Sequence, residues 1–521
     1  MNLISRICNA KYGVAMFLFV YVVLCQMVFN IDSYLYANTG HYDAAIFFQC
    51  GKFLMNGYTP YVDFADSKGL LLWIIYGVGY QVHHYSYIGV FWLACLSFWG
   101  AFIIAYKTAR LYLDKPQALV AAMSMIVPYW YWNFYTEGKA EHFCMPCVAF
   151  VFYQLLKMIK HSQSVSSAGE KSDEEVRNHI TLKMSWFGIG LCFVAVVMIK
   201  WSIGLMMMSL IVSMGIYAFK NHAIVSYLLS VVLGIVVSAL PFFIYFIATD
   251  SMGAMWHEYF ANTMASVSEP LPKTIVSYSH EWLRMVTTKR IIYIVYTLPL
   301  LLLWNRKQWF VSALPWLSAM FFIALAIRHD NFGHYISIVG PFAIFAIVSL
   351  MRCLQKHHVA LRYYAGMLML AMGYLVWGKL HYCNDNFFTH ADKATKFEAV
   401  NWQMAHTVEH PTLLIMGQDP GYCMGYSRPY CRYWISQMGQ TQAMFDAQEK
   451  ALAEGKADFV SLNEPQVIRK YEPMLLAEGY HLMNTYNGFH IYTKHIAPPL
   501  PANFHVSAID ILTKRNMAGF E

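Results

Sequence analysis

Long apolar runs, separated by short polar loops, cover the first 380 residues of the chain. A helix of roughly 17 to 25 apolar residues is long enough to cross the hydrocarbon core of a bilayer. Residues 69–82 are apolar but short, so this pattern predicts about 11 to 13 spans. The spans are expected near residues 12–30, 86–106, 117–132, 142–159, 183–199, 202–219, 223–249, 290–304, 308–327, 335–352 and 360–379.

Composition supports this interpretation. The chain has 521 residues, of which 58% are hydrophobic and 13% charged, and its mean hydropathy is +0.39. A soluble domain has about half apolar and about a quarter charged residues. Aromatic side chains make up 17% of the chain, which fits belts of rings at the membrane interfaces. We therefore expect a polytopic α-helical membrane protein.

Lysine and arginine in short loops predict the orientation, because positively charged loops stay in the cytoplasm. Residues 13–29 follow Arg6 and Lys11 without a small-residue cleavage site, so a retained signal-anchor is expected. The loops expected in the cytoplasm are 107–115, 157–183, 220–222, 305–308 and 352–362. The opposite face then receives 31–68, 133–141, 250–289, 328–334 and everything after 380.

The chain changes character after residue 380. Residues 410–419 and 457–462 have the pattern of buried strands, and 444–455 and 468–479 have the pattern of helices stopped by glycine. Residues 480–494 predict a hairpin closed by Asn487 and Gly488. We therefore expect two domains. Residues 1–379 form a transmembrane domain with an outer loop at 31–68, and residues 380–521 form a small α/β domain that binds an acceptor or serves as a structural cap.

Several functional classes are disfavoured. The net charge of +7 comes from scattered residues rather than a basic run with interleaved aromatics, so nucleic acid is not an expected partner. The chain has no GxSxG, HExxH or Walker motif to support a hydrolase or an ATPase. Cys144 and Cys147 form a CxxC inside an apolar run, where cysteines act as small hydrophobic residues. Cys423 and Cys431 could pair in an oxidising compartment.

The notable ionisable residues all fall on the face opposite the cytoplasm, apart from Lys200, which lies in an apolar stretch expected to end near that face. Charged groups at membrane depth are costly, and a functional site is the default interpretation of them. The set comprises Asp32, Asp43, Asp63, Asp66, Lys68, Glu137, Lys139, Glu141, Lys200, Asp250, His257, Glu258, Arg284, Arg328, His329, Asp330, His334 and Tyr335.

A sugar donor linked to a lipid phosphate would use both carboxylates and cations. The phosphate is already a good leaving group, so the cations need only hold it and stabilise the charge that grows as it departs. The acceptor hydroxyl or amine needs a base, which a carboxylate supplies. Attack opposite the phosphate inverts the anomeric centre. On charge and position alone, Lys200, Arg328 and His334 are candidates to bind the phosphate.

The first outer loop carries a recognisable pattern: His41, Tyr42 and Asp43, followed by MNGYTPYVDFADSKG at 55–69. This pattern resembles the signature of the GT-C superfamily of polyprenyl-phosphate-sugar glycosyltransferases. It is similar to the branch that contains aminoarabinose transferases and protein O-mannosyltransferases. Thr136–Glu137 and HYISIVGPFAIF at 334–345 are further similarities. The proline usual after the lysine and glycine is Leu70 here.

The resemblance implies roles for individual residues. Asp43 would be the base that activates the acceptor, and Asp66 with Lys68 would orient the loop or contact the donor phosphate. Glu137 would be a second acid near the acceptor. Residues expected to support the acceptor or the loop are Tyr42, Tyr61, Asp63 and Tyr335. Members of this branch need no metal, although three acids on one face leave a divalent cation possible.

The resemblance implies a multi-pass protein of a bacterial inner membrane, with its active site and C-terminal domain facing the periplasm. The expected partners are a polyprenyl-phosphate-linked sugar, a glycan, lipid or protein acceptor, and membrane lipids. One alternative is a transporter or flippase of polyprenyl-linked sugars, although the internal repeats typical of transporters are not evident. Another is a non-catalytic relative that acts in assembly.

Overall fold

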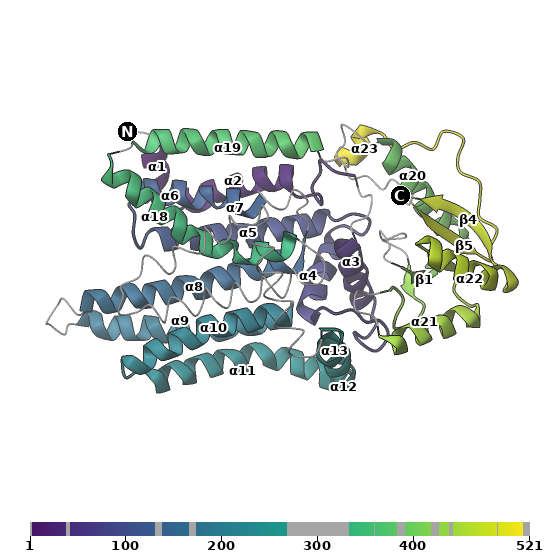
Figure 1. The fold of residues 1–521 in the computed structure, drawn as a ribbon, viewed down its shortest axis with the longest axis horizontal. Helices are drawn as coiled ribbons and strands as arrows, with labels where there is room; N and C mark the ends of the chain where they lie inside the picture. Colours follow the sequence, from purple (N-terminus) through teal and green to yellow (C-terminus); the bar gives the residue numbers. More distant parts are fainter. Residues whose placement is uncertain are drawn as a thin grey trace.

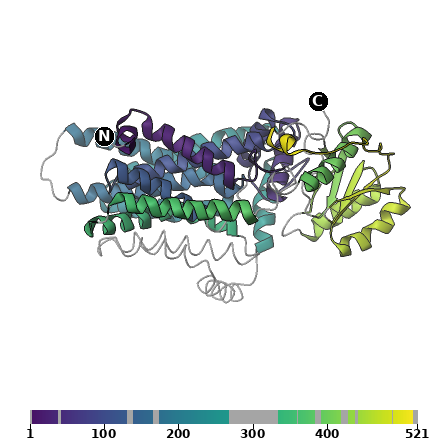
Figure 2. The same cartoon turned by 90° about the horizontal axis from the view of Figure 1, so that it is seen from above.

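The computed structural model describes residues 3–37, 42–130, 138–165, 173–267, 333–358, 360–382, 391–417, 427–436, 441–486 and 488–513. In these ranges the chain forms a long bundle of helices with a small α/β unit at one end (Figure 1). A view at right angles shows the N-terminus at the end of the bundle that is far from the sheet (Figure 2).

Most of the bundle helices run along the long axis of the molecule (Figures 1 and 2). They are α1 (Leu3–Asn9), α2 (Gly13–Phe29), α5 (Ile88–Ala109), α6 (Lys115–Ser124), α7 (Ile126–Trp130), α8 (Ala140–Val165), α9 (Asp173–Val197), α10 (Trp201–Lys220), α11 (Ile224–Ala248), α18 (Ala343–Lys356) and α19 (Leu361–Tyr382). A 3-10 helix, η3 (Gly333–Phe342), leads into α18.

Among the described residues, four helices are long and apolar enough to cross a membrane: Ile88–Ala109, Ala140–Lys160, Trp201–Lys220 and Ile224–Ala248. Shorter apolar helices are Gly13–Phe29, Leu70–Val82 and Lys183–Val197. Only 17% of the apolar window of α11 is buried inside the protein, which suits a surface that faces lipid. The prediction of a polytopic helical membrane protein is confirmed.

Some predicted boundaries change. The spans expected at 117–132 and 335–352 each consist of two helical pieces, α6 with α7 and η3 with α18. Helices α8 and α9 also extend into the loop expected at 157–183, because helices continue through polar residues beyond the apolar core. The spans expected at 290–304 and 308–327 lie outside the described residues.

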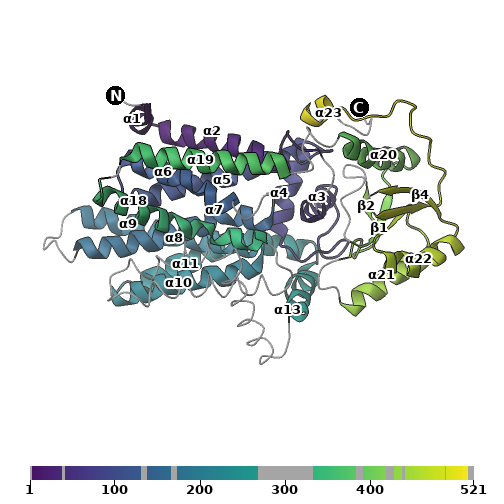
Figure 3. The same cartoon turned by 45° about the horizontal axis from the view of Figure 1, so that its top comes forward.

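Two shorter helices, α3 (Tyr42–Met55) and α4 (Leu70–Val82), lie between the bundle and the α/β unit (Figures 1 and 3). They pack closely because both carry glycine at the contact. A Cβ atom on Gly51 would lie 2.5 Å from the backbone nitrogen of Gly77. The ambiguous segment 69–82 is thus a helix of 13 residues, about 20 Å long and too short to cross a bilayer core of about 30 Å.

The α/β unit contains a five-stranded sheet in the order β2-β1-β3-β5-β4. Strand β1 (Thr412–Met416) is parallel to β2 (Arg428–Pro429) and β3 (Phe459–Leu462), and β5 (Phe489–Thr493) is antiparallel to β3 and β4 (His481–Tyr486). The helices are α20 (Ala391–Thr407), α21 (Gln442–Glu454), α22 (Pro465–Ala477) and α23 (Ala508–Thr513). The predicted strands, helices and hairpin are confirmed, whereas α20 and β2 were not predicted.

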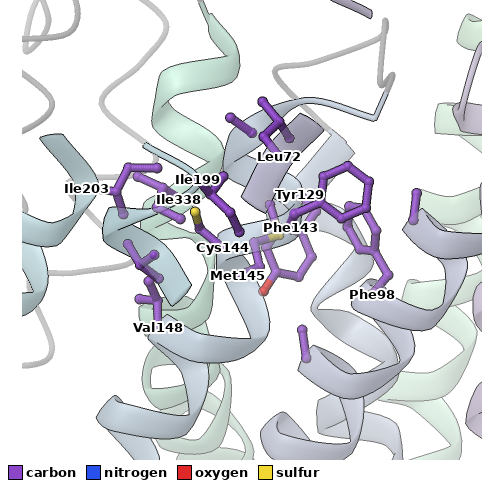
Figure 4. Packing of buried hydrophobic residues seen from close by; sticks show 14 of the residues in the cluster. Leu72, Phe98, Tyr129, Phe143, Cys144, Met145, Val148, Ile199, Ile203 and Ile338 are labelled. Atoms are coloured by element: carbon purple, nitrogen blue, oxygen red, sulfur yellow. The ribbon is translucent and has the colours of Figure 1, made fainter. Parts of the chain in front are cut away.

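Among the described residues, the largest apolar core lies inside the bundle and continues past α3 and α4 into the α/β unit, where it includes Phe397, Trp434 and Ile491. Figure 4 shows side chains of α4, α5, α7, α8, α10 and η3 meeting inside the bundle, among them Leu72, Phe143, Cys144 and Ile203. Ile199 belongs to the same cluster and directly precedes Lys200. The polar groups described below therefore rest on a packed, water-excluding layer.

Candidate active site

A tight turn joins α3 to α4 and carries most of the signature residues. Tyr61 is fully buried and adopts a left-handed backbone conformation with φ of 65°, which costs roughly 1–2 kcal/mol for a residue other than glycine. Its backbone nitrogen donates to the carbonyl of Phe64 at 2.7 Å, and its hydroxyl donates to the carbonyl of Lys68 at 2.8 Å. Its ring packs 4.7 Å from the ring of Trp73. Tyr61 therefore holds the turn in shape from inside.

The two aspartates of the turn have different environments. Asp63 is exposed and accepts a hydrogen bond from the backbone nitrogen of Thr59 at 2.6 Å, so it caps the turn. Asp66 is only 6% exposed, and its Oδ2 atom has no hydrogen-bond partner among the described residues. Burial raises the pKa of the Cys50 thiol, and the nearby carboxyl group of Asp66 raises it further. A buried carboxyl oxygen left unpaired is costly, which is a mark of a functional group.

The end of the turn docks on the connection between α9 and α10. The backbone nitrogen of Gly69 donates to the carbonyl of Ile199 at 3.1 Å. A Cβ atom at Gly69 would lie 2.1 Å from the carbonyl oxygen of Met198, so only glycine permits this approach. Lys68 and Lys200, the neighbours of this bonded pair, are thus brought to the same place although 132 positions separate them in the sequence.

Lys200 forms a buried ion pair at this point. Its Nζ atom lies 2.5 Å from Oε1 of Glu141, and the two side chains are 13% and 3% exposed. The hydroxyl of Tyr259 fixes the backbone on both sides of Lys200: it donates to the carbonyl of Val197 at 2.5 Å and accepts from the backbone nitrogen of Trp201 at 2.8 Å. Lys200 is therefore held at the bundle end by both side-chain and backbone contacts.

A second ion pair lies just before α8. Oδ2 of Asp43, in the first turn of α3, is 3.8 Å from Nζ of Lys139, and the Asp43 side chain is 41% exposed. Nearby, the backbone nitrogen of Gly138 donates to Oδ2 of the buried Asp32 at 2.7 Å. Lys139 and Glu141 thus connect the first loop on one side to Lys200 on the other.

The Lys68 side chain lies on the same loop. Its ammonium group is 5.4 Å from the centre of the Phe47 ring and donates to the hydroxyl of Ser67 at 2.8 Å. A serine hydroxyl and an aromatic face are weak partners for an ammonium group. A phosphate oxygen is a stronger partner and can replace the hydroxyl and the ring at the ammonium group of Lys68.

The structure brings together the predicted Asp43, Asp66, Lys68 and Lys200, and places Tyr61 and Asp63 in the turn beside them. Glu137, Arg328 and Cys423 lie outside the described residues. Only the backbone is described for Tyr42, which opens α3, and for His334 and Tyr335, which lie in η3. Within the described ranges, no group of three or more His, Cys, Asp and Glu side chains is arranged to hold a metal ion.

Some residues of the site were not predicted. Lys139 and Glu141 were expected on this face for their charge alone, and no sequence signal indicated that Lys139 would pair with Asp43 and Glu141 with Lys200. Arg432, which contacts the signature turn from the α/β unit, carries no signal in the sequence at all.

Comparison with known proteins finds a family model that matches part of the chain and a solved structure with a similar fold over 94% of it. Residues 68–167 match the model of the dolichyl-phosphate-mannose-protein mannosyltransferase family. No curated protein matches the sequence. The structure of ArnT from Cupriavidus metallidurans bound to undecaprenyl phosphate has a TM-score of 0.54 and 13% identity, covering 94% of this chain and 100% of that chain.

The oligosaccharyltransferase of Archaeoglobus fulgidus in complex with Zn and sulfate has a TM-score of 0.49 and 12% identity, covering 93% of this chain and 75% of that chain. The matched family segment begins at Lys68 and includes Lys139 and Glu141, so it contains three of the charged groups gathered here. The predicted resemblance is confirmed in two respects: the chain has a fold similar to that of ArnT, and residues 68–167 match the model of the dolichyl-phosphate-mannose-protein mannosyltransferase family.

Proposed function

We propose that the protein is an inverting glycosyltransferase that moves a sugar from a polyprenyl phosphate to an acceptor hydroxyl or amine at the outer face of the cytoplasmic membrane. One observation carries the proposal. Three segments far apart in sequence bring carboxyl groups and lysines together at the end of the bundle: the first loop, the start of α8 and the α9–α10 connection. ArnT, which shares the fold, was crystallised with undecaprenyl phosphate, a lipid phosphate of the proposed class.

In this proposal Lys68 and Lys200 bind the donor phosphate. The lysines lie next to the hydrogen-bonded residues Gly69 and Ile199, so their spacing is fixed by the backbone. Fixed positive charges stabilise the negative charge that develops as the phosphate leaves, without reorganising during the reaction. Arg328 and His334 remain candidates for the same task on charge and position in the sequence.

Asp43 is the proposed base. Its side chain is 41% exposed and pairs with Lys139 across 3.8 Å, a contact worth about 0–1 kcal/mol, so an acceptor can displace it at little cost. The carboxylate takes the proton of the acceptor as its oxygen or nitrogen attacks the anomeric carbon. The bond from that carbon to the phosphate oxygen breaks, polyprenyl phosphate departs, and the anomeric centre inverts.

Asp66 is proposed to orient the loop or contact the donor, and Glu137 to lie near the acceptor. Because two lysines supply the positive charge at the phosphate, we propose that transfer needs no metal. A chelator such as EDTA should then leave the rate unchanged. A chelator-sensitive rate that Mg²⁺ or Mn²⁺ restores would contradict this part of the proposal.

The decisive test compares glycans of the native host, by mass spectrometry, with and without the protein. Asp43→Asn should abolish the added sugar while undecaprenyl phosphate still binds the purified protein, and Asp63→Asn, on the same loop but exposed, serves as the control. Full activity of Asp43→Asn would exclude Asp43 as the base. Lys200→Ala should weaken undecaprenyl phosphate binding about tenfold or more, as expected for loss of a charged contact. Sugar transfer by the purified protein distinguishes the enzyme from a transporter, because a transporter moves the lipid-linked donor without transferring its sugar.

A further inference from the structure

A segment of the α/β unit, residues 427–436, is fixed to the sheet along its length. It begins with β2, which is parallel to β1. Further along, the backbone nitrogen of Ile415 in β1 donates to the carbonyl of Trp434 at 2.7 Å, and the nitrogen of Ser436 donates to the carbonyl of Ile415 at 3.2 Å. The segment therefore behaves as an extension of the sheet rather than as a free loop.

The same segment packs on α3. The ring of Trp434 is 2% exposed and meets the ring of Phe53 edge-on at 5.3 Å. The hydroxyl of Ser427 accepts a hydrogen bond from Nζ of the buried Lys52 at 3.0 Å. Figures 1 and 3 show the resulting arrangement, with α3 lying between the bundle and the sheet. The docking is thus apolar at its centre and polar beside it.

Arg432 lies in the middle of the segment and contacts the signature turn twice. Its carbonyl accepts from the backbone nitrogen of Ala65 at 2.9 Å, and its Nε atom donates to the carbonyl of Val62 at 3.0 Å. These two bonds hold the turn at Val62 and at Ala65, the residue that directly precedes Asp66. The turn is therefore held from outside by Arg432 and from inside by Tyr61.

Arg432 and its neighbour also reach a third segment, the short π-helix η1 (Trp256–Ala261) after α11. Oε1 of Glu258, whose side chain is 2% exposed, lies 3.4 Å from Nη1 of Arg432 and accepts from the hydroxyl of Tyr433 at 2.7 Å. Burial and the neighbouring Glu258 raise the pKa of Tyr433 to about 12, so its hydroxyl keeps the proton that it donates.

We infer that Arg432 is a positioning residue for the transfer reaction: it clamps the 59–69 turn to the sheet, and so holds Lys68 and Asp66 where donor binding needs them. This inference rests on the proposed function for its reaction, but the clamp itself rests only on the contacts above. The role needs the forked guanidinium group of arginine, because Nε donates to the carbonyl of Val62 while Nη1 pairs with the carboxylate of Glu258. A lysine has one ammonium group on a flexible stem and can replace only part of this.

The test uses the full-length protein in nanodiscs and compares Arg432→Ala, Arg432→Lys, Tyr433→Phe and Arg428→Ala. Arg428 is an exposed arginine in β2, four residues away, and serves as the matched control. Two quantities are measured: amide hydrogen exchange by segment, and the dissociation constant for undecaprenyl phosphate.

Arg432→Ala should speed exchange within residues 59–69 about tenfold and raise the dissociation constant about tenfold, the order expected for loss of a charged hydrogen bond. Exchange in β1, β3 and β5 should not change. Arg432→Lys should fall between the wild type and Arg432→Ala. Tyr433→Phe should speed exchange around Glu258 without affecting the turn, and Arg428→Ala should change neither quantity.

Unchanged exchange of the turn in Arg432→Ala would overturn the inference. So would faster exchange that extends equally through the sheet, since that would make Arg432 a general stabilising residue. If the wild type binds no undecaprenyl phosphate, the proposed donor class fails, whereas the exchange of the turn still decides the clamp. The two failures are therefore distinguishable.

Discussion

The buried carboxyl group of Asp66 predicts that removing it makes the protein more stable and less active. Within the part of the chain that the structure describes, its Oδ2 atom has no hydrogen-bond partner, and the residue is 6% exposed. An unsatisfied buried polar atom costs about 1–3 kcal/mol. Asp66→Ala removes this cost but leaves a small cavity, which lowers the free energy of unfolding by about 1 kcal/mol. We expect a net gain in the free energy of unfolding of about 1 kcal/mol, together with loss of sugar transfer.

Asp63 provides the matched control, because it lies three residues earlier on the same turn and its carboxylate is satisfied. Asp63→Ala loses the hydrogen bond from the Thr59 nitrogen and should lower stability while leaving most of the activity. Reversible unfolding in mixtures of detergent and SDS measures the change in stability of each variant. The reasoning fails if Asp66→Ala unfolds more readily than the wild type, since Asp66 would then support the fold rather than be constrained by function.

Three further variants test how the site is built. Gly69→Ala places a Cβ atom against the backbone of Met198, in the connection between α9 and α10, and should cost about 1–3 kcal/mol and weaken undecaprenyl phosphate binding; Gly253→Ala, which meets open space among the described residues, should do neither. Glu141→Gln and Lys200→Met should each destabilise, and the double variant should recover about 2 kcal/mol in a double-mutant cycle; additive losses would show that the ion pair is not coupled. Tyr259→Phe should lower the free energy of unfolding by about 1–2 kcal/mol, because two backbone groups lose the hydroxyl that joins them; an unchanged unfolding curve would count against that bridge.

The parts of the fold with a local cause could be predicted from the sequence. Apolar runs gave the helices, and Gly488, with φ of 86°, closes the hairpin between β4 and β5 as expected. The α3–α4 turn was also recognisable, because its signature residues are consecutive. Its separation of roles, with Asp63 exposed and Asp66 buried, follows from how the turn folds around Tyr61.

The contacts between distant segments could not be predicted. The bond from Gly69 to Ile199 depends on the docking of the α3–α4 turn on the α9–α10 connection, and neither position carries a pattern that indicates its partner. The same holds for Arg432, whose sequence context, CRYWIS, is that of an ordinary strand edge. Its importance arises only when the sheet docks on α3. Such pairings are set by tertiary geometry, to which a single sequence gives no local clue.

The contact between Arg432 and the signature turn also bears on how the protein is made. Ribosomes add about 5–20 residues per second, and about 360 residues separate the turn from Arg432, so the nascent first loop is without its outer support for about 20–70 s. A chain that is released early carries Asp66 and Lys68 in a turn that lacks its outer support. In the proposed mechanism, such a chain lacks the contact that holds Lys68 and Asp66 in place.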